Sequence, residues 1–264
     1  MSVPLRLRQP NAGLLRTLWY EMCRWVVRGV YRVLYRPIIS GAENVPSTGP
    51  LLLAANHQSY IDPPFVCLYI SRHASFVARA GLFKWKFFGW LIGSLNATPI
   101  KEEGGDGAAI KEILRRLGEG HAVIIFPEGS RTQDGSMDEF KRGVALLVRK
   151  AGCPVVPVGL EGCFDAFPRG GWPRIWGKRI GLRYGNAIAP EELMGAGAGE
   201  GLARLAREVD ALRLHLRREM REETRGRYPP PGPGDEPAWA KTESAAGRRA
   251  RPPATRQSGE HRPG

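Results

Sequence analysis

His57 and Asp62 are the first two side chains whose types and spacing could carry out chemistry. An imidazole can take a proton from an alcohol, and a carboxylate that accepts its Nδ1–H leaves Nε2 free to do so. On one continuous helix, residues five apart would lie on different faces. If His57 instead follows a strand and Asp62 caps the next helix, the loop between them can bring the two together. The pair therefore predicts a general base, a group that accelerates a reaction by about 10²–10⁴-fold.

A second cluster, Phe-Pro-Glu-Gly-Ser-Arg-Thr at 126–132, directly follows a predicted strand. Binding residues in α/β proteins favour such strand ends. Gly129 allows backbone to approach a ligand closely, and Arg131 offers a two-pronged donor for a phosphate group. Glu128 can accept hydrogen bonds from a substrate hydroxyl or from Arg131. Taken alone, the segment could also be a solvated turn with a Glu–Arg surface pair.

The elements that must position these residues follow an alternating pattern. Residues 51–55 are a continuous apolar run, as expected of a buried parallel strand, and Asp62 is predicted as the N-cap of a helix that opens with two prolines. The alternation continues with a helix at 108–117, a strand at 122–126, a helix at 143–150, a strand at 155–159 and a half-exposed strand at 180–184. The sequence therefore predicts an α/β fold with a mixed, mainly parallel sheet flanked by helices.

The N-terminal segment 1–40 is predicted to form a membrane-associating amphipathic helix. Within 14–35, arginines recur every fourth position and so share one helix face, beside other faces rich in Val, Leu, Trp and Tyr. A basic face next to an aromatic one favours a helix lying in the lipid headgroup layer. The alternative is a helix packed on the protein with its arginines in water.

The remainder divides into a main domain at 41–225 and a tail at 226–264. The main domain closes with an amphipathic helix whose apolar stripe runs from Leu202 to Met220. The tail contains no Leu, Ile, Val, Met or Phe and is rich in Pro, Gly and Arg. Such a composition cannot offset the entropy of ordering, so the tail is predicted to be disordered.

Charge and cysteine content limit the classes of partner. The chain has 39 Lys and Arg against 26 Asp and Glu, a formal net charge of +13, which predicts an anionic partner: nucleic acid, an anionic membrane surface or a phosphorylated substrate. No nucleic-acid-binding module is recognisable, so nucleic acid is not expected. The four cysteines have neither zinc-site nor disulfide-scaffold spacing, and we expect reduced thiols and no metal.

No transmembrane helix is expected. The longest uncharged apolar run, 87–100, is shorter than the roughly 20 residues that span a bilayer, and it contains Gly, Asn and Pro. The start of the chain lacks a secretory pattern. Segment 82–90 is aromatic with two lysines, and it either dips into lipid or forms a core helix whose lysines reach water.

Several blocks resemble one known family, the glycerolipid acyltransferases of the PlsC type, which are 1-acylglycerol-3-phosphate acyltransferases. Residues 56–62, Asn-His-Gln-Ser-Tyr-Ile-Asp, resemble the family's first motif, which implies that His57 is the catalytic base and Asp62 its partner. Residues 126–132 resemble the third motif, which implies a glycerophosphate site; the residues concerned are Glu128, Gly129, Ser130 and Arg131, with serine where the family often has threonine. The resemblance spans roughly residues 40 to 190.

Two further blocks carry the resemblance less directly. Val155, Val156 and Pro157 begin a stretch like the fourth motif, which implies acyl-donor binding or packing beside the site. The second motif normally ends in arginine, whereas here Lys101 stands in that place and keeps the charge without the planar fork. Lys141 is a further candidate for the acceptor phosphate, or else part of a solvated helix start.

The resemblance implies an enzyme that moves a fatty acyl group from acyl-CoA or acyl carrier protein to the sn-2 hydroxyl of 1-acyl-sn-glycerol-3-phosphate. The product would be phosphatidic acid, made without a cofactor at the cytoplasmic face of the cell membrane by a peripheral or monotopic protein. Alternative acceptors are other lysophospholipids, glycerol 3-phosphate and lyso-forms of amino-acid lipids. Other classes are a serine lipid hydrolase using Ser59 or Ser130, which lacks a Gly-x-Ser-x-Gly elbow here, and a non-catalytic basic binding protein.

Overall fold

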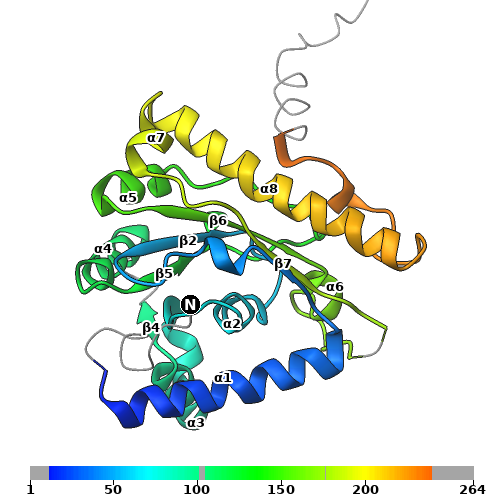
Figure 1. The fold of residues 1–264 in the computed structure, drawn as a ribbon, viewed down its shortest axis with the longest axis horizontal. Coiled ribbons are helices and arrows are strands. Elements are labelled where there is room, and N and C mark those ends of the chain that lie inside the picture. The colour runs from blue at the N-terminus through cyan, green and yellow to red at the C-terminus, as the bar shows by residue number, and fades with distance from the viewer. Residues whose placement is uncertain (1–11, 101–104, 176, 240–264) are drawn as a thin grey trace, which may run out of the picture.

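The computed structural model describes residues 12–100, 105–175 and 177–239. These residues form a seven-stranded sheet in the order β1-β7-β6-β2-β5-β3-β4 (Figure 1). Neighbouring strands from β6 to β4 are parallel, whereas β7 is antiparallel to β6 and parallel to β1. The strands are β1 (Ile38–Ser40), β2 (Leu51–Ala55), β3 (Ala74–Arg79), β4 (Ala97–Ile100), β5 (Ala122–Ile125), β6 (Val155–Glu161) and β7 (Gly181–Tyr184). The predicted mixed, mainly parallel α/β sheet is confirmed.

Helices cover both faces of the sheet, which explains why its central strands are apolar throughout (Figure 1). Alternate residues of β2 enter different cores: Leu51 and Leu53 pack on the side of α1 and α2, and Leu52 packs on the side of α4, α5 and α8. The helices are α1 (Leu14–Tyr35), α2 (Asp62–Leu68), α3 (Lys86–Ser94), α4 (Gly105–Gly118), α5 (Gly143–Ala151), α6 (Cys163–Ala166), α7 (Pro190–Met194) and α8 (Ala198–Glu223), with 3₁₀ turns η2 (Ala42–Asn44), η3 (Ala80–Lys84) and η5 (Pro233–Asp235).

The prediction that the strand near 180–184 is half-exposed is wrong. Leu182 and Tyr184 are buried on one face, and Gly181 lies under α8, where an added Cβ would come within 2.7 Å of Met220. Arg183, on the same face of β7 as Gly181, pairs with Glu219 of α8 at 2.8 Å. The polar residues of β7 therefore face a helix instead of water.

The arginines of helix α1 do not all face solvent, and much of its apolar face is exposed. Arg24 is buried and donates to Glu21 and to the Ile70 carbonyl at 2.7 Å, and Arg28 donates to the Leu68 carbonyl. These carbonyls lie at and just beyond the C-terminal end of α2, where cations are favoured. Arg24 therefore has neither predicted role, contact with headgroups or exposure to water, whereas Arg28 is half-buried and Arg32 is exposed as predicted.

The segment around α3 is not a core helix. Trp85, Phe87 and Trp90 expose 78%, 74% and 57% of their surface. The Trp19 ring of α1 lies 5.6 Å from the Trp90 ring, and its indole N–H donates to Ser94 at 2.9 Å. Helix α3 is therefore fixed beside α1 with its aromatic side chains facing outward.

Both predicted domain boundaries need correction. Strand β1 lies within the predicted N-terminal segment 1–40, yet it pairs with β7 as part of the sheet. Residues 226–239, predicted to be disordered, pack against α8, and Tyr228 is only 7% exposed. Arginine side chains of α8 hold this segment by hydrogen bonds to its carbonyls, an interaction that hydropathy does not reveal. Residues 240–264 lie outside the described part of the chain.

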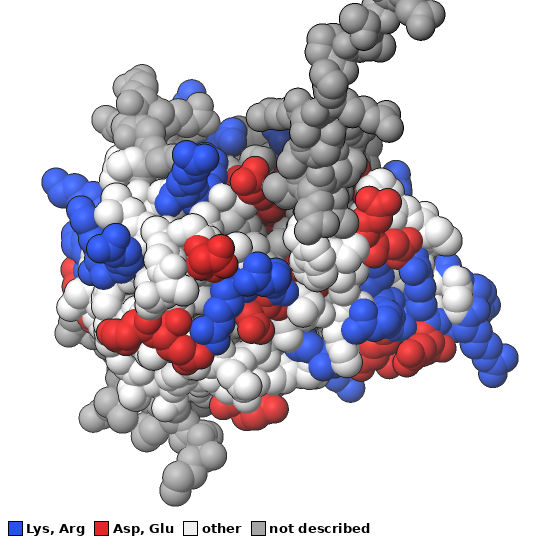
Figure 2. Space-filling model, turned by 90° about the horizontal axis from the view of Figure 1, so that it is seen from above, with Lys and Arg blue, Asp and Glu red and all other residues white. Residues whose placement is uncertain are grey.

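The face of the molecule on the α8 side interleaves acidic and basic side chains (Figure 2). Part of this mixture consists of ion pairs, such as Arg204 with Glu192 and Arg179 with Glu223. This face therefore does not present a field of one sign.

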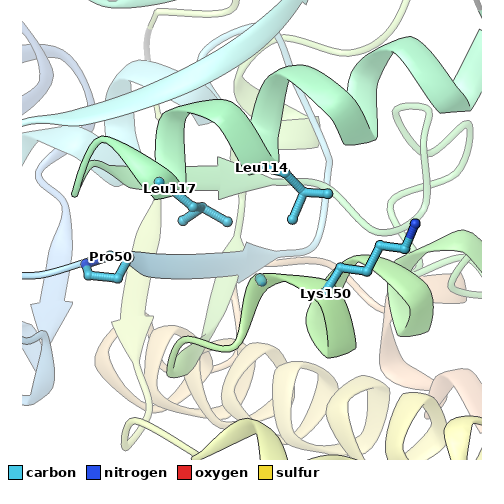
Figure 3. A pocket seen from close by; sticks show the side chains of 6 residues that line it. Pro50, Leu114, Leu117 and Lys150 are labelled. Atoms are coloured by element: carbon cyan, nitrogen blue, oxygen red, sulfur yellow. The ribbon is translucent and has the colours of Figure 1, made fainter.

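A shallow pocket of about 560 Å³ lies between α4 and α5 (Figure 3). Pro50, Leu114, Leu117 and Lys150 line it. Pro50 precedes β2, whereas His57 follows that strand, so the pocket lies at the opposite end of the strand from the candidate site.

Candidate active site

His57 and Asp62 meet in the loop between β2 and α2. The His57 Nδ1 atom lies 2.8 Å from Asp62 Oδ2. Because an ionised carboxylate only accepts hydrogen bonds, Nδ1 carries the proton and Nε2 keeps its lone pair. The predicted pairing is confirmed in geometry, and the imidazole can accept a proton at Nε2.

Asp62 is the first residue of α2 and not its N-cap, a position held by Ile61. Its Oδ2 atom also accepts the backbone N–H groups of Gln58 at 2.5 Å and Ser59 at 2.6 Å. The side chain is fully buried. These donors fix the carboxylate, so Asp62 closes its own loop as well as aligning the imidazole.

The loop after β5 carries residues 126–132 to the same edge of the sheet. Strands β2 and β5 are parallel neighbours, so the segments that follow them emerge side by side. The Thr132 N–H donates to the His57 carbonyl at 2.9 Å, and the Phe126 ring stacks on the His57 ring with centroids 3.9 Å apart. The two predicted clusters therefore form one site.

Glu128 joins these loops through the backbone. Its carboxylate accepts the His57 N–H at 2.6 Å and the Asp138 N–H at 2.8 Å, and the residue is 6% exposed. The suggested bond from Glu128 to Arg131 is absent from the hydrogen bonds and ion pairs of the described residues. In this geometry Glu128 positions His57.

We expect Glu128→Gln to weaken both the fold and the activity. One carboxyl oxygen becomes an NH₂ group that faces a backbone N–H, and a buried N–H left without an acceptor costs about 1–3 kcal/mol. The free energy of unfolding, measured in urea, should fall by that amount. The kcat should also fall, because Glu128 positions His57. Glu139→Gln, at an exposed glutamate, is the matched control. Equal stability of the two variants would contradict this role for Glu128.

Stability should also depend on pH through Glu128. Burial raises the pKa of this carboxyl from 4.5 to about 8, although its two backbone donors oppose the shift. A pKa higher in the folded than in the unfolded state gives stability that is complete below the unfolded pKa and is lost as pH rises towards 8. Unfolding free energies measured from pH 4.5 to 8 should therefore decline more steeply for the wild type than for Glu128→Gln. Parallel curves would contradict the prediction.

Arg131 is held beside the pair and keeps hydrogen-bonding capacity. Its guanidinium carbon lies 3.4 Å from the centre of the Tyr60 ring, and its buried Nη1 atom has no hydrogen-bond partner. The Lys141 side chain lies over Gly129, where an added Cβ would come within 2.3 Å of Lys141 Cε. Gly129 has a φ of 72°, which suits glycine, and Ser130 is half-buried next to it. The structure thus brings Lys141 and the predicted Glu-Gly-Ser-Arg residues together.

The other predicted site residues do not reach this cluster in the same way. Lys101 lies outside the described residues; the edge strand β4 ends at Ile100, just before it. Val155 and Val156 are fully buried in the two cores, and Pro157 is buried in β6. Direct contact of these three side chains with an acyl donor is therefore not supported, whereas packing beside the site is, because β6 pairs with β2.

Sequence reasoning missed the roles of three residues within its own motifs. Phe126 stacks on the base, Tyr60 covers Arg131, and the Gln58 side chain reaches Glu161 at the end of β6 at 3.4 Å. Each lies next to or within a predicted motif. The sequence feature that could have indicated these roles is an aromatic or amide residue close to a predicted site residue.

Ser59 does not have the surroundings of a nucleophile. It is fully buried, and its hydroxyl donates to the Phe167 carbonyl at 2.6 Å. A serine nucleophile must instead present its oxygen both to its base and to a substrate. This geometry argues against the hydrolase alternative through Ser59.

Comparison with known proteins relates part of the chain to a known family. An acyltransferase family model matches residues 36–161, the span that holds both loops of the site. These residues are similar to the acyltransferase family. The chain is 31% identical over 149 residues to a chloroplastic 1-acyl-sn-glycerol-3-phosphate acyltransferase of Brassica napus, a match covering 55% of this chain and 43% of the relative. It is 29% identical over 163 residues to a 1-acyl-sn-glycerol-3-phosphate acyltransferase of Pseudomonas aeruginosa, with 60% and 61% covered.

Two further matches extend along most of this chain. A lyso-ornithine lipid O-acyltransferase of Pseudomonas aeruginosa is 28% identical over 224 residues, which cover 81% of this chain and 85% of that protein. The crystal structure of a 1-acyl-sn-glycerophosphate acyltransferase, PlsC, from Thermotoga maritima matches with a TM-score of 0.65 at 24% identity, covering 81% of this chain and 83% of the other. The structural likeness concerns the fold.

Proposed function

We propose that this chain transfers a fatty acyl group from a thioester to the sn-2 hydroxyl of 1-acyl-sn-glycerol-3-phosphate, giving phosphatidic acid for phospholipid biosynthesis. The observation that carries the proposal is the 2.8 Å contact between His57 Nδ1 and Asp62 Oδ2, beside the loop that holds Arg131. The acyltransferase relatives support the same class of reaction, although the chain spans only 43% of the Brassica relative's length and 61% of the shorter Pseudomonas one.

The proposed reaction uses one base and no covalent acyl-enzyme. His57 Nε2 takes the proton of the lysolipid hydroxyl as the oxygen attacks the thioester carbonyl. The tetrahedral intermediate then collapses, the C–S bond breaks, and the thiolate leaves with the proton from the imidazolium. Asp62 stabilises the imidazolium between the two proton transfers, and no cofactor is needed.

We assign the acceptor phosphate to the cationic side of the site. Arg131 has an unpartnered, buried Nη1 atom, and a guanidinium binds phosphate oxygens in pairs. Lys141 lies over the neighbouring Gly129, and Lys101 follows the end of β4. For the donor we propose acyl-CoA or acyl carrier protein, both of which present the same thioester.

A donor and acceptor panel tests the proposal. The purified protein is incubated with lysophosphatidate and either acyl-CoA or acyl-acyl carrier protein, while thiol release is followed and products are identified by lipid mass spectrometry. Phosphatidic acid formed in step with free thiol is expected. Free fatty acid with a pre-steady-state burst would favour a hydrolase, and no turnover with any acceptor would favour a non-catalytic protein.

A second candidate acceptor is a lyso-ornithine lipid. The alignment with the lyso-ornithine lipid O-acyltransferase covers 81% of this chain, so it extends beyond residues 36–161. The alignment with the Brassica relative covers 55%. A lyso-ornithine lipid carries an amino acid where lysophosphatidate carries a phosphate, so it has less need of the Arg131 fork. Arg131→Lys should raise KM for lysophosphatidate more than KM for lyso-ornithine lipid.

We also propose that α1 and α3 attach the enzyme to the cytoplasmic surface of the cell membrane. No helix among the described residues is long and apolar enough to cross a bilayer. On α1 the exposed side chains include Leu15, Trp25 and Val33, at 84%, 62% and 77%, and the exposed aromatic side chains of α3 stand beside that helix. An apolar surface of this kind suits insertion into the headgroup boundary, with anionic lipids as partners of the basic chain.

Replacing Trp85, Phe87 and Trp90 together by serine should abolish most liposome binding. Burying each large apolar side chain contributes about 1.5–3 kcal/mol, so the triple change should weaken binding by at least about 100-fold. Co-sedimentation with vesicles containing anionic lipid measures this. Trp239→Ser is the control, because Trp239 is half-exposed at the end of the segment beside α8. Unchanged binding of the folded triple variant would refute the proposed attachment.

A further inference from the structure

Residues 228–238, here called the C-terminal strap, lie along α8 (Figure 1). Three arginines spaced four residues apart on α8 bind backbone carbonyls of the strap. Arg213 donates to Gly234 at 2.6 Å, Arg217 to Pro230 at 2.7 Å, and Arg221 to Pro229 at 2.9 Å. The strap lies wholly outside residues 36–161, which the family model matches.

Asp235 is the strap's charged contact with α8. Its Oδ1 atom accepts from Arg217 Nε at 2.6 Å and lies 2.7 Å from Arg221 Nη1. Its Oδ2 atom accepts the Gly232 N–H at 2.8 Å and so closes the strap's own turn. Asp235 therefore sets the orientation of the Arg217 guanidinium.

Arg217 also reaches into the sheet. Its Nη1 atom donates to Glu161 Oε1 at 2.5 Å, and Glu161, the last residue of β6, is 2% exposed. A buried carboxylate is costly unless it is paired, so Glu161 depends on its arginine partners. Arg213 lies 3.6 Å from the other carboxylate oxygen.

The same carboxylate holds the residue next to the base. Gln58 Nε2 donates to Glu161 Oε2 and to the Gly135 carbonyl, each at 3.4 Å, and Gln58 Oε1 accepts the Phe164 N–H at 3.3 Å. The backbone N–H of Gln58 in turn binds Asp62 Oδ2 at 2.5 Å. A continuous chain of hydrogen bonds thus runs from Asp235 through Arg217, Glu161 and Gln58 to the Asp62 carboxylate.

We infer that the C-terminal strap positions the His57/Asp62 pair through Asp235, Arg217, Glu161 and Gln58. These four are positioning residues, since none of them is assigned a contact with substrate. The inference rests on the proposed acyl transfer. A displacement of about 1 Å at a reacting group can cost about 100-fold in rate, so a small loosening of Gln58 has a measurable effect on kcat.

The kinetic test uses a double-mutant cycle in the full-length protein. Asp235→Asn should lower kcat about 3- to 10-fold and Gln58→Ala about 10- to 100-fold, with KM values within about twofold of wild type. The double variant should be no slower than Gln58→Ala, because the chain of bonds is already cut. Glu219→Gln removes a different α8 ion pair, that with Arg183, and should match the wild type. All variants are assayed at a temperature where near-ultraviolet circular dichroism shows them folded.

A second readout needs no substrate. The ¹⁵N signal of the His57 imidazole reports its Nδ1–H bond to Asp62, and it should change in Asp235→Asn and Gln58→Ala but not in Glu219→Gln. Wild-type kcat in Asp235→Asn, multiplicative effects in the double variant, or an unchanged His57 signal would overturn the inference. If the wild type is inactive but its His57 signal still changes in Asp235→Asn, the proposed acyl transfer is overturned. The positioning of His57 and Asp62 by the strap then still stands.

Discussion

Asp62→Asn is expected to lower kcat by about 10³–10⁴-fold, since the corresponding change in a serine-protease triad costs about 10⁴-fold through the wrong imidazole tautomer. Asp62 accepts hydrogen bonds from His57 Nδ1, Gln58 N and Ser59 N at a single oxygen. An asparagine NH₂ placed there would confront three donors, and an asparagine oxygen placed there would lose the negative charge. In either orientation the imidazolium formed during proton transfer is less stable.

Steady-state kinetics with lysophosphatidate and acyl-CoA, together with a thermal melt, measure this effect. The double variant His57→Ala/Asp62→Asn should be no slower than His57→Ala, because residues that act as one unit have non-additive effects. A folded Asp62→Asn variant with more than about a tenth of wild-type kcat would contradict the role of the carboxylate, given the expected fold-change.

The central strands of the sheet and the two loops of the site could be predicted because they depend on local patterns, whereas strands β1 and β3 were not predicted. Continuous apolar runs identify strands covered on both faces, and β2 and β5 are of this kind. Once two strands are parallel neighbours, the loops that follow them meet at one edge, which placed His57 beside residues 126–132. Motif order and strand ends were therefore sufficient to identify both loops, whereas the pairing of β2 with β5 came from the structure.

The direction in which a helix face points could not be predicted from its periodicity. The spacing of Arg24 and Arg28 correctly indicates a shared face, but a guanidinium can face water, lipid headgroups or protein carbonyls. Which of these applies depends on where α2 lies, because the carbonyls at its C-terminal end and just beyond it accept hydrogen bonds from the arginines only after the chain has folded. As a result, the apolar face of α1 is exposed and the polar face is partly buried.

The order of residues 226–239 and the position of Glu128 escaped prediction for a related reason. Composition measures how much apolar surface a segment can bury, but this segment is held mainly by arginine bonds to its carbonyls. Glu128 looked like a ligand for substrate, yet it binds the backbone of His57 and Asp138. Hydrogen bonds between side chain and distant backbone leave no periodic trace in a sequence.

His57→Ala tests the central claim most directly, because it removes the proposed base and leaves the side chains of the proposed membrane attachment unchanged. Purified wild-type and variant protein are incubated with lysophosphatidate and acyl-CoA, and phosphatidic acid is measured by mass spectrometry. The variant should form it about 10²–10⁴-fold more slowly, as expected for loss of a general base. His215→Ala, at an exposed histidine of α8, should equal the wild type. A folded His57→Ala variant that makes phosphatidic acid at the wild-type rate would contradict the proposed mechanism.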